Sequence, residues 1–436
     1  MFKINGPWLI PGEQDEVIHD LVCGSLVKWD NARNLPLKSG GKTDVYINIR
    51  DARSRPKMIR RLAEVFENPI RRLRPDRIVE VPEAITPVAG HLSAMTGIPL
   101  VTIREEEKPG RVVKGRAVGD LRAGERVVIT DDVITDGESK LAALRFLRDA
   151  GVEVLALVVL VDRQQGWKKK LAEAGFGDIQ VWAGMTLHDV RKNLISERLM
   201  QRCDPALEAK NPIIVALDGK PWEEYLPIVD RLRPGGCILK ANDLLLEDDV
   251  NTVIRNLGVY GRVMADAKLH DIPNTVANFC SRIGKTPPWG LTVHASGGSE
   301  MIKAAVKTLT GTPTIVLAVT VLTSLGDQCE EIYARRPLEE VRMLANIAYK
   351  AGARGFVCSS EEVEVIRGMY PDATIVVPAL HSPKNDAPSD QRRTGTFIEA
   401  KKKGADFLVG GRQFTNAEDP VAEIQRVLKE ELAIGI

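Results

Sequence analysis

Cysteine is scarce in this chain, and no two cysteines lie close together in the sequence. The six residues are Cys23, Cys203, Cys237, Cys280, Cys329 and Cys358, in a chain of 436 residues. Zinc sites and disulfide frameworks both need characteristic cysteine spacings. We therefore expect neither, and this cysteine usage indicates a reducing compartment, the cytoplasm.

The sequence also lacks an excess of one charge and a long hydrophobic run. Its 60 Lys and Arg residues against 59 Asp and Glu residues leave a net charge of +1, which gives no bulk electrostatic reason to expect nucleic acid or an anionic membrane as a partner. The longest apolar run, residues 152–161, contains Glu153 and is well short of the roughly 20 residues of a membrane-spanning helix. Residues 1–15 lack the layout of a signal peptide.

What remains is the composition of an ordinary folded protein. Hydrophobic residues make up 44% and charged residues 27%, as in typical globular proteins. The length allows two or three domains, each with its own core. Pro205 and the pair Asn211-Pro212 mark the best candidate for a linker. We therefore expect a first domain at residues 1–200, a linker at 201–211 and a second domain at 212–436.

Charge is concentrated in residues 262–275. The first part alternates like a buried strand, and Asp266 and Lys268 lie two positions apart, so their side chains share one face. Asp271 follows the end of the strand, and Pro273 prevents the strand from continuing. Two carboxylates and an ammonium group among apolar residues are costly to bury unless they pair. We therefore interpret this stretch as an active site rather than a solvated strand end.

The second half contains apolar strand candidates separated by helical patterns. They are residues 213–217, 237–239, 262–267, 291–294, 314–321, 355–358, 374–377 and 407–409. Such a series of eight βα units is what a (β/α)8 TIM barrel requires, and the active sites of these barrels lie at the carboxyl ends of the strands. Unusual polar residues follow the strands there, namely Asp218, Lys240, Asp266 with Lys268, His294, Ser324 and Arg412.

This half resembles the orotidine 5′-monophosphate decarboxylases over essentially its whole length. The matching segments are Val215-Ala-Leu-Asp218, Leu239-Lys240, Asp266-Ala-Lys-Leu-His-Asp271 with Ile272-Pro-Asn-Thr275, Val293-His-Ala-Ser-Gly-Gly298, Thr320-Val-Leu-Thr-Ser324, Asp390-Gln-Arg-Arg393 and Gly410-Gly-Arg412. Related phosphosugar decarboxylases and synthases share Asp-x-Lys-x-x-Asp but do not normally carry the longer segments. A phosphosugar-acting barrel is therefore the less favoured interpretation.

The resemblance implies roles for the matching residues. The catalytic charge array would consist of Lys240, Asp266, Lys268 and Asp271. The substrate-binding residues would be Asp218 for the ribose, Thr275, Ser324 for the pyrimidine amide edge, and Gln391 and Arg412 for the phosphate. Asp271 and Thr275 would reach the neighbouring subunit's site, which makes the active unit a dimer. The resemblance implies no cofactor and no metal in this half.

One departure from that family lies after the seventh strand candidate. Ala379 stands where a Gly is usual, and His381 stands where an Arg is common. We expect this change to loosen the grip on the phosphate without touching the chemistry.

The first half alternates apolar runs with helical patterns, which predicts an α/β domain with a mostly parallel sheet. The runs are residues 77–81, 98–103, 126–130 and 153–161. The third run carries Asp131 and Asp132 at its tip, and the loop that opens the next helix contains Thr135, Asp136, Gly137 and Ser139. Backbone N–H groups and hydroxyls at a helix N-terminus can hold a phosphate. The adjacent acids can hold ribose hydroxyls, directly or through Mg²⁺, whereas the plainer interpretation is ordinary helix capping.

This segment resembles the phosphoribosyl pyrophosphate signature of type I phosphoribosyltransferases, and orotate phosphoribosyltransferase fits best. Residues 37–48, which begin Leu-Lys-Ser-Gly, and residues 161–166, which contain Asp-Arg, resemble two further segments of that enzyme. The resemblance implies that the donor and orotate are bound by Lys38, Arg104, Lys108, Asp131, Asp132, Thr135, Asp136, Gly137, Ser139 and Arg163. It also implies Mg²⁺ together with the donor.

Two departures bear on the first half. The mobile loop carries Glu105 where the family has Lys, and residues 81–86 replace a pyrophosphate loop that commonly contains Gly. Acids there oppose the binding of a tetra-anionic donor, although Arg111, Lys114 and Arg116 are available to compensate. The whole chain resembles the bifunctional uridine 5′-monophosphate synthases, with the transferase first. The alternative is a decarboxylase whose first half is a non-catalytic nucleotide-binding or dimerisation module.

Overall fold

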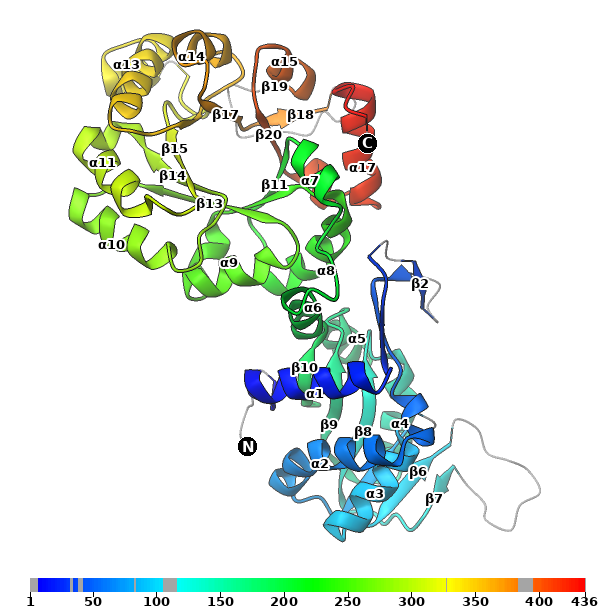
Figure 1. Ribbon diagram of the computed structural model, residues 1–436. Helices are drawn as coiled ribbons and strands as arrows, with labels where there is room; N and C mark the ends of the chain where they lie inside the picture. The colour runs from blue at the N-terminus through cyan, green and yellow to red at the C-terminus, as the bar shows by residue number, and fades with distance from the viewer. Residues whose placement is uncertain are drawn as a thin grey trace. The chain divides into compact units, whose positions relative to one another are not determined.

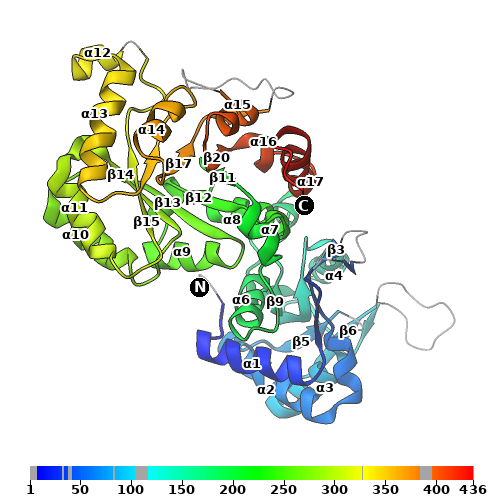
Figure 2. The same cartoon turned by 45° about the horizontal axis from the view of Figure 1, so that its top comes forward.

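A computed structural model describes residues 7–31, 34–37, 42–81, 84–104, 116–326, 328–382 and 395–435. The chain divides into two compact units, Met1–Met200 and Gln201–Ile436. Both units combine parallel strands with helices (Figures 1 and 2). The α/β class predicted from the sequence is therefore confirmed.

The first unit is built on a six-stranded sheet with the strand order β10-β9-β8-β5-β6-β7. Its strands are β5 (Arg77–Glu80), β6 (Leu100–Ile103), β7 (Ala117–Val118), β8 (Arg126–Ile134), β9 (Glu153–Asp162) and β10 (Val181–Thr186). Neighbouring strands run parallel except β7, which is antiparallel to β6. Strands β8 and β9 are rich in Val, Leu and Ile because both faces of this sheet are covered.

Helices cover the two faces of this sheet. One face packs against α1 (Pro11–Cys23), α2 (Pro56–Leu73), α3 (Thr86–Thr96) and α6 (Leu187–Ser196), and the other against α4 (Glu138–Asp149) and α5 (Trp167–Glu173). The turn η1 (Ile49–Ser54) precedes α2. Two short antiparallel pairs complete the unit, β1 (Val27–Trp29) with β4 (Val45–Ile47) and β2 (Leu35–Pro36) with β3 (Lys42–Thr43).

The second unit is a closed barrel of parallel strands, which confirms the predicted TIM barrel. Its strands are β11 (Ile213–Leu217), β12 (Ile238–Ala241), β13 (Arg262–Leu269), β14 (Gly290–His294), β15 (Ile315–Val319), β16 (Gly355–Val357), β17 (Thr374–Val377) and β20 (Phe407–Gly410). The short strands β18 (Leu380–His381) and β19 (Gly395–Thr396) pair outside the barrel.

Helices and helical turns surround the barrel. They are α7 (Pro205–Lys210), α8 (Trp222–Leu232), η2 (Arg233–Gly235), η3 (Asp243–Leu246), α9 (Val250–Gly258), α10 (Pro273–Ile283), η4 (Ala295–Gly297), α11 (Gly298–Leu309), α12 (Gln328–Tyr333), α13 (Pro337–Lys350), α14 (Val363–Met369), α15 (Phe397–Lys402), α16 (Arg412–Thr415), α17 (Pro420–Arg426) and η5 (Val427–Glu431). Helix α7 lies within the stretch expected to be a linker, residues 201–211. The structure groups it with the second unit.

The barrel interior is apolar along most of its length. Ile214, Ile238, Met264, Leu317, Val376 and Val409 form its central cluster. Gly290 and Gly355 leave room for Leu317, because a Cβ at either position would lie 2.8 Å or 2.4 Å from a Leu317 methyl carbon. Trp289 and Phe407 meet edge to face at 4.6 Å, beside the amino ends of β14 and β20. The polar side chains that point into the barrel lie at the carboxyl ends of its strands.

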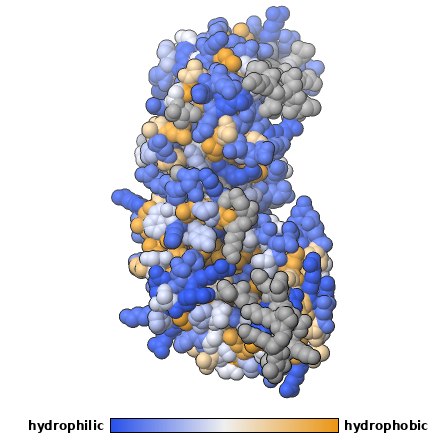
Figure 3. Space-filling view, turned by 90° about the vertical axis from the view of Figure 1, so that its right-hand side faces the viewer, coloured by the Kyte–Doolittle hydropathy of each residue, from blue (hydrophilic) through white to orange (hydrophobic). Residues whose placement is uncertain are grey.

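The surface is mainly hydrophilic on the face drawn in Figure 3, where hydrophobic side chains form small scattered groups. Among the helices that the structure describes, none is long and apolar enough to cross a lipid bilayer.

Candidate active site

A cavity of about 1030 Å³ lies at the carboxyl ends of the barrel strands. The first three strands supply four charged lining residues, with Asp218 after β11, Lys240 in β12, and Asp266 and Lys268 in β13. Inward-facing residues alternate with outward-facing ones along each strand of a barrel. Met264, Asp266 and Lys268 therefore follow one another from the apolar interior toward the cavity.

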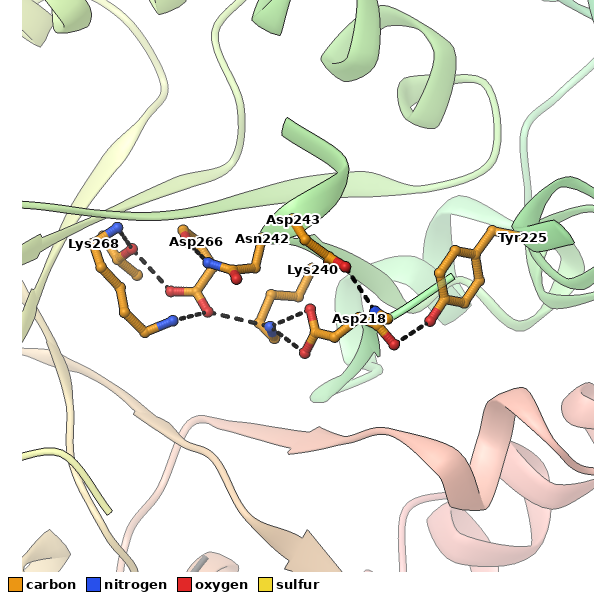
Figure 4. A network of polar contacts seen from close by, with 9 residues as sticks. Asp218, Tyr225, Lys240, Asn242, Asp243, Asp266 and Lys268 are labelled. Atoms are coloured by element: carbon orange, nitrogen blue, oxygen red, sulfur yellow. Dashed lines mark hydrogen bonds and ion pairs between the residues drawn. The ribbon is translucent and has the colours of Figure 1, made fainter. Parts of the chain in front are cut away.

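These four charged residues form a continuous chain of ion pairs (Figure 4). Lys240 Nζ lies 2.9 and 2.8 Å from the two carboxylate oxygens of Asp218 and 3.1 Å from Asp266 Oδ2. Lys268 Nζ lies 2.6 Å from the same Asp266 oxygen. The side chains of Lys240 and Asp266 are each 9% exposed, whereas those of Lys268 and Asp218 are 36% and 47% exposed. The array is thus buried at its centre and open at both ends.

The position of Asp266 is fixed by several neighbours. Thr292, in β14, donates a hydrogen bond from Oγ1 to Asp266 Oδ1 at 2.9 Å and accepts one from the Lys268 N–H at 2.8 Å. Asn242 donates from its side-chain amide to the Asp266 carbonyl oxygen at 2.6 Å. The pairing of β13 with β14 shifts between Ala265 and Leu269, and Lys268 has a left-handed backbone with φ 45°. Such strain in a residue with a Cβ is typical of functional sites.

The array remains ionised because its charges compensate one another. Burial alone raises the pKa of Asp266, but the ammonium groups of Lys240 and Lys268 outweigh burial and hold that pKa below its usual range. Burial alone lowers the pKa of Lys240, but Asp266 and Asp218 outweigh it and raise that pKa. An uncompensated charge at this depth would neutralise instead.

The opposite wall of the cavity is formed by residues that follow the later strands of the barrel. Ser324, Ala379, His381, Arg412, Gln413 and Glu423 line it. Gln413 donates to Glu423 Oε1 at 2.7 Å, and its own Oε1 accepts from the N–H of Ser382 at 2.9 Å. Arg426 donates from Nε and Nη2 to the two oxygens of Glu423, both at 2.8 Å. Side chains of the C-terminal helices thereby hold this wall.

Asp271 and Thr275 are the two residues expected to reach the site of a neighbouring subunit. Asp271 and Thr275 are exposed and do not line the cavity in the described part of the chain. Gln391 lies outside the described residues. His270 and His294 have ring centres 5.4 Å apart. Burial, and then the neighbouring His270 and Lys268, lower the pKa of His294.

In the first unit, the two adjacent acids at the end of β8 have different surroundings. Asp131 is 2% exposed and forms an ion pair with Lys140, which projects from α4 and is 5% exposed. Asp132 is partly exposed and accepts a hydrogen bond from the Val133 N–H at 2.7 Å. Burial and the charge of Asp131 raise the pKa of Asp132 to about 7. Asp132 is therefore the more accessible of the two carboxylates.

The loop after β8 leads directly into α4. Thr135, Asp136 and Ser139 are partly or fully exposed, and Gly137, the residue immediately before α4, has φ 83°. The N–H of Glu138 donates to Asp136 Oδ1 at 3.1 Å. In its present conformation the loop thus caps its own helix.

The proposed orotate residue Arg163 is 6% exposed. It donates to Thr43 Oγ1 at 2.9 Å and to the Val45 carbonyl at 3.5 Å. Beside these residues, Asp44 and Arg191 form a buried two-point ion pair at 2.8 Å. Arg104 extends β6, where its N–H donates to the Arg116 carbonyl at 2.9 Å. The described residues do not include Lys38, Glu105, Lys108, Arg111, Lys114 and the altered residues 82–83.

Sequence reasoning missed several residues that support these sites. Thr292 lies two positions before His294, so the period of two in β14 was an available signal for its inward direction. Lys140 in α4 and Gln413, Glu423 and Arg426 near the C-terminus gave no such signal, because surface helices also carry these residue types. Within the described chain, no group of three or more His, Cys, Asp or Glu side chains is arranged to hold a metal ion.

Comparison with known proteins finds a matching family model for each part of the chain. Residues 211–427 match the model of the "Orotidine 5′-phosphate decarboxylase / HUMPS family", and residues 51–190 match that of the "Phosphoribosyl transferase domain". An orotidine 5′-phosphate decarboxylase of Chromobacterium violaceum is 36% identical over 230 residues, which are 51% of this chain and 92% of that protein.

Two solved structures are similar to parts of the chain. UMP synthase of Leishmania donovani aligns at 32% identity with a TM-score of 0.39, over 44% of this chain and 40% of that one. Orotate phosphoribosyltransferase of Aeropyrum pernix aligns at 26% identity with a TM-score of 0.36, over 41% of this chain and 98% of that one.

Proposed function

The chain belongs to the orotidine 5′-phosphate decarboxylase / HUMPS family, and on that premise we propose that it catalyses the last two steps toward uridine 5′-monophosphate (UMP). The first unit joins orotate to phosphoribosyl pyrophosphate, and the barrel decarboxylates the orotidine 5′-monophosphate that results. The observation that carries the proposal is the array of Lys240, Asp266 and Lys268 at the cavity, which is buried at its centre. A purely structural role would leave these charges buried without a reason.

The charges of the array suit the decarboxylation. The substrate carboxylate lies against Asp266, which disfavours the anionic ground state more than a transition state whose charge has moved onto the ring. The bond from C6 to the carboxylate carbon breaks, carbon dioxide leaves, and the electron pair stays on C6. Lys240 and Lys268 stabilise that carbanion electrostatically. Lys268, the more exposed of the two, gives its proton to C6 and recovers one from solvent.

The remaining lining residues bind the rest of the substrate in this proposal. Asp218 accepts hydrogen bonds from the ribose hydroxyls through its exposed side. Ser324 binds the pyrimidine amide edge, and Arg412, at the N-terminus of α16, binds the phosphate together with Gln391. A side-chain cation beside backbone N–H groups at the last strands is a common phosphate site in these barrels. The decarboxylation requires no cofactor.

Asp271 and Thr275 complete the site of a second copy in a homodimer. Two observations support this assignment. Both residues are exposed at the carboxyl end of β13, beyond the array. The apolar side chains of Ile272, which follows β13, and Leu246, at the end of η3, are 65% and 88% exposed. A second copy packed against this end of the barrel would remove both side chains from water, which is favourable.

In the first unit, the bond from C1 of the ribose to pyrophosphate breaks and a bond from C1 to N1 of orotate forms, while pyrophosphate leaves and the N1 proton passes to solvent. Asp132 holds the ribose hydroxyls of the donor, while Asp131 remains paired with Lys140. Thr135, Gly137 and Ser139 offer hydroxyl and N–H groups to the 5′-phosphate. The partly exposed Asp132 carboxylate also suits Mg²⁺, a hard cation that prefers oxygen ligands. When bound with the donor, Mg²⁺ supplies neutralisation of the pyrophosphate charge.

The test is a pair of assays on the full-length protein. Orotate loss is followed with magnesium and phosphoribosyl pyrophosphate, and decarboxylation of orotidine 5′-monophosphate is followed in parallel. We expect both activities, with Lys268→Ala abolishing only decarboxylation and Asp132→Asn abolishing only orotate loss. Lys303→Ala and Asp149→Asn, at exposed positions of α11 and α4, are the matched controls.

The two assays separate the alternatives. Decarboxylation without orotate loss would assign a non-catalytic nucleotide-binding or dimerisation role to the first unit. An inactive wild-type protein on orotidine 5′-monophosphate would overturn the proposed function and favour a phosphosugar substrate for the barrel.

A further inference from the structure

The peptide group that joins Asp218 to Gly219 is held at both of its polar atoms. Tyr225, in α8, donates its hydroxyl hydrogen to the Asp218 carbonyl oxygen at 2.6 Å. The N–H of Gly219 donates to Asp243 Oδ2, in η3, at 2.8 Å. Figure 4 shows these two contacts at the end of the charge array. Because Lys240 also binds both carboxylate oxygens of Asp218, the backbone and side chain of Asp218 are fixed together.

These two hydrogen bonds restrain a peptide group that could otherwise rotate. Gly219 has φ 86°, and a glycine in this region exchanges readily with other conformations. The side chain of Asp218 is 47% exposed, so the fixed carboxylate faces the cavity. The contacts on this peptide and the ion pair with Lys240 therefore hold the Asp218 carboxylate in place together.

Tyr225 and Asp243, which form these two hydrogen bonds, are themselves constrained. Tyr225 is 2% exposed, and burial, followed by Asp218 and Asp243, raises its pKa to about 12, so the phenol stays a donor at neutral pH. Asp243 uses Oδ2 for Gly219, while its buried Oδ1 has no hydrogen-bond partner in the described part of the chain. A buried carboxylate oxygen without a partner is costly.

We propose that Tyr225 and Asp243 are positioning residues that set the selectivity of the barrel for ribose over deoxyribose by fixing Asp218. The inference rests on the proposed function, in which Asp218 accepts hydrogen bonds from the ribose hydroxyls. Tyr225 and Asp243 act through the Asp218–Gly219 peptide and do not touch the nucleotide. Their loss lets the carboxylate turn away from the hydroxyls while the pyrimidine and phosphate contacts remain.

The experiment compares the dissociation constants (Kd) of UMP, 2′-deoxy-UMP and 3′-deoxy-UMP by calorimetry with the full-length protein. Hydrogen bonds to a charged group are at the strong end of the range. The wild-type protein should therefore prefer UMP to at least one deoxy analogue by about 10-fold or more, a ratio equivalent to about 1.4 kcal/mol. Asp218→Ala removes the carboxylate. The Kd of the deoxy analogue divided by the Kd of UMP in this variant is therefore the lowest ratio that the site can show.

Tyr225→Phe and Asp243→Ala should each lower the ratio at least about three-fold toward that of Asp218→Ala, and the Kd of the deoxy analogue should stay the same. Asp243→Asn keeps an acceptor for the Gly219 N–H and should retain the wild-type ratio. Asp248→Ala, an exposed acid that accepts from the Asp249 N–H, is the control. Tyr225→Phe provides the test by itself if Asp243→Ala does not fold.

Two results would overturn the inference alone. One is an unchanged ratio in both variants, and the other is an equal loss of affinity for UMP and its deoxy analogues, which a merely structural role predicts. A wild-type protein that binds no UMP would instead overturn the proposed function, and with it this inference.

Discussion

The hydroxyl of Thr292 lies 2.9 Å from Asp266 Oδ1 and donates a hydrogen bond to it. The same hydroxyl accepts the Lys268 N–H at 2.8 Å. One fully buried side chain in β14 therefore joins the side chain of the central carboxylate to the backbone of the residue proposed as proton donor. Because Lys268 has a left-handed backbone, the contact also supports a conformation that is unfavourable by itself.

Thr292→Val should slow decarboxylation with little change in substrate affinity. Valine has the same shape, but it leaves Asp266 Oδ1 and the Lys268 N–H without this partner. Loss of a hydrogen bond to a charged group costs about 1.5–3 kcal/mol, which corresponds to a kcat about 10- to 100-fold lower. Thr292→Ser keeps the hydroxyl and should restore most of the rate. A Thr292→Val enzyme with wild-type kcat would contradict this role.

Asp132→Asn should stabilise the first unit at pH 8 but not at pH 4. The pKa of Asp132 in the folded protein, about 7, lies above its value in an unfolded chain. The protonated Asp132 carboxyl therefore contributes fully to the free energy of unfolding below about pH 4. This contribution is lost as the pH rises through about 7. Asparagine stays neutral throughout, so the gain at pH 8 should be on the order of 1–3 kcal/mol.

Scanning calorimetry at the two pH values measures this difference. Asp149→Asn, at an exposed position near the end of α4, is the control and should show no such dependence on pH. An Asp132→Asn protein that gains equal stability at both values would mean that the charge of Asp132 is not the cause.

Ala379→Gly should stabilise the second unit by about 0.5–1 kcal/mol, because Ala379 has φ 60° and a Cβ is unfavourable in that conformation. Urea unfolding measures the change. Ala373→Gly, at a buried alanine with an ordinary backbone, should destabilise the unit instead. A less stable Ala379→Gly protein would show that the Ala379 methyl group makes packing contacts worth more than the strain it causes.

The sequence predicts the fold well because periodicity reports directly on burial. Eight apolar runs separated by helical patterns fit few architectures besides a closed barrel. The alternation along residues 262–268 likewise places Asp266 and Lys268 on one face. Element ends are less predictable. Lys240 follows the apolar run at residues 237–239, but the structure includes it in β12, because the hydrogen bonds between strands continue past the last apolar residue.

The surroundings of the site residues are beyond sequence patterns. No spacing indicates that Lys140 pairs with Asp131, since a lysine in the first turn of an amphipathic helix usually faces solvent. The left-handed φ of Lys268 depends on the shift in strand pairing between β13 and β14. Both features arise from contacts between segments, and a local pattern carries no information about them.

Arg426→Met should weaken the binding of UMP about 10-fold and the binding of uridine hardly at all. Glu423 and Glu431 accept from Arg426 at 2.8–2.9 Å, and these carboxylates raise the pKa of Arg426, so the guanidinium stays charged. Without it the two partly buried acids repel each other. Gln413, which Glu423 holds, then moves beside Arg412, the residue proposed to bind the phosphate.

The two ligands separate this effect from general destabilisation. UMP carries the phosphate that the displaced wall would no longer fit, whereas uridine relies on Asp218 and Ser324 on other strands. Calorimetry should therefore show a selective loss for UMP, with Lys429→Met, at an exposed position of η5, unchanged. If Arg426→Met weakens both ligands equally, the C-terminal network stabilises the whole unit rather than its phosphate wall. The same comparison with Glu423→Gln, which keeps an acceptor for Gln413 but removes the charge, distinguishes the hydrogen bond from the ion pair.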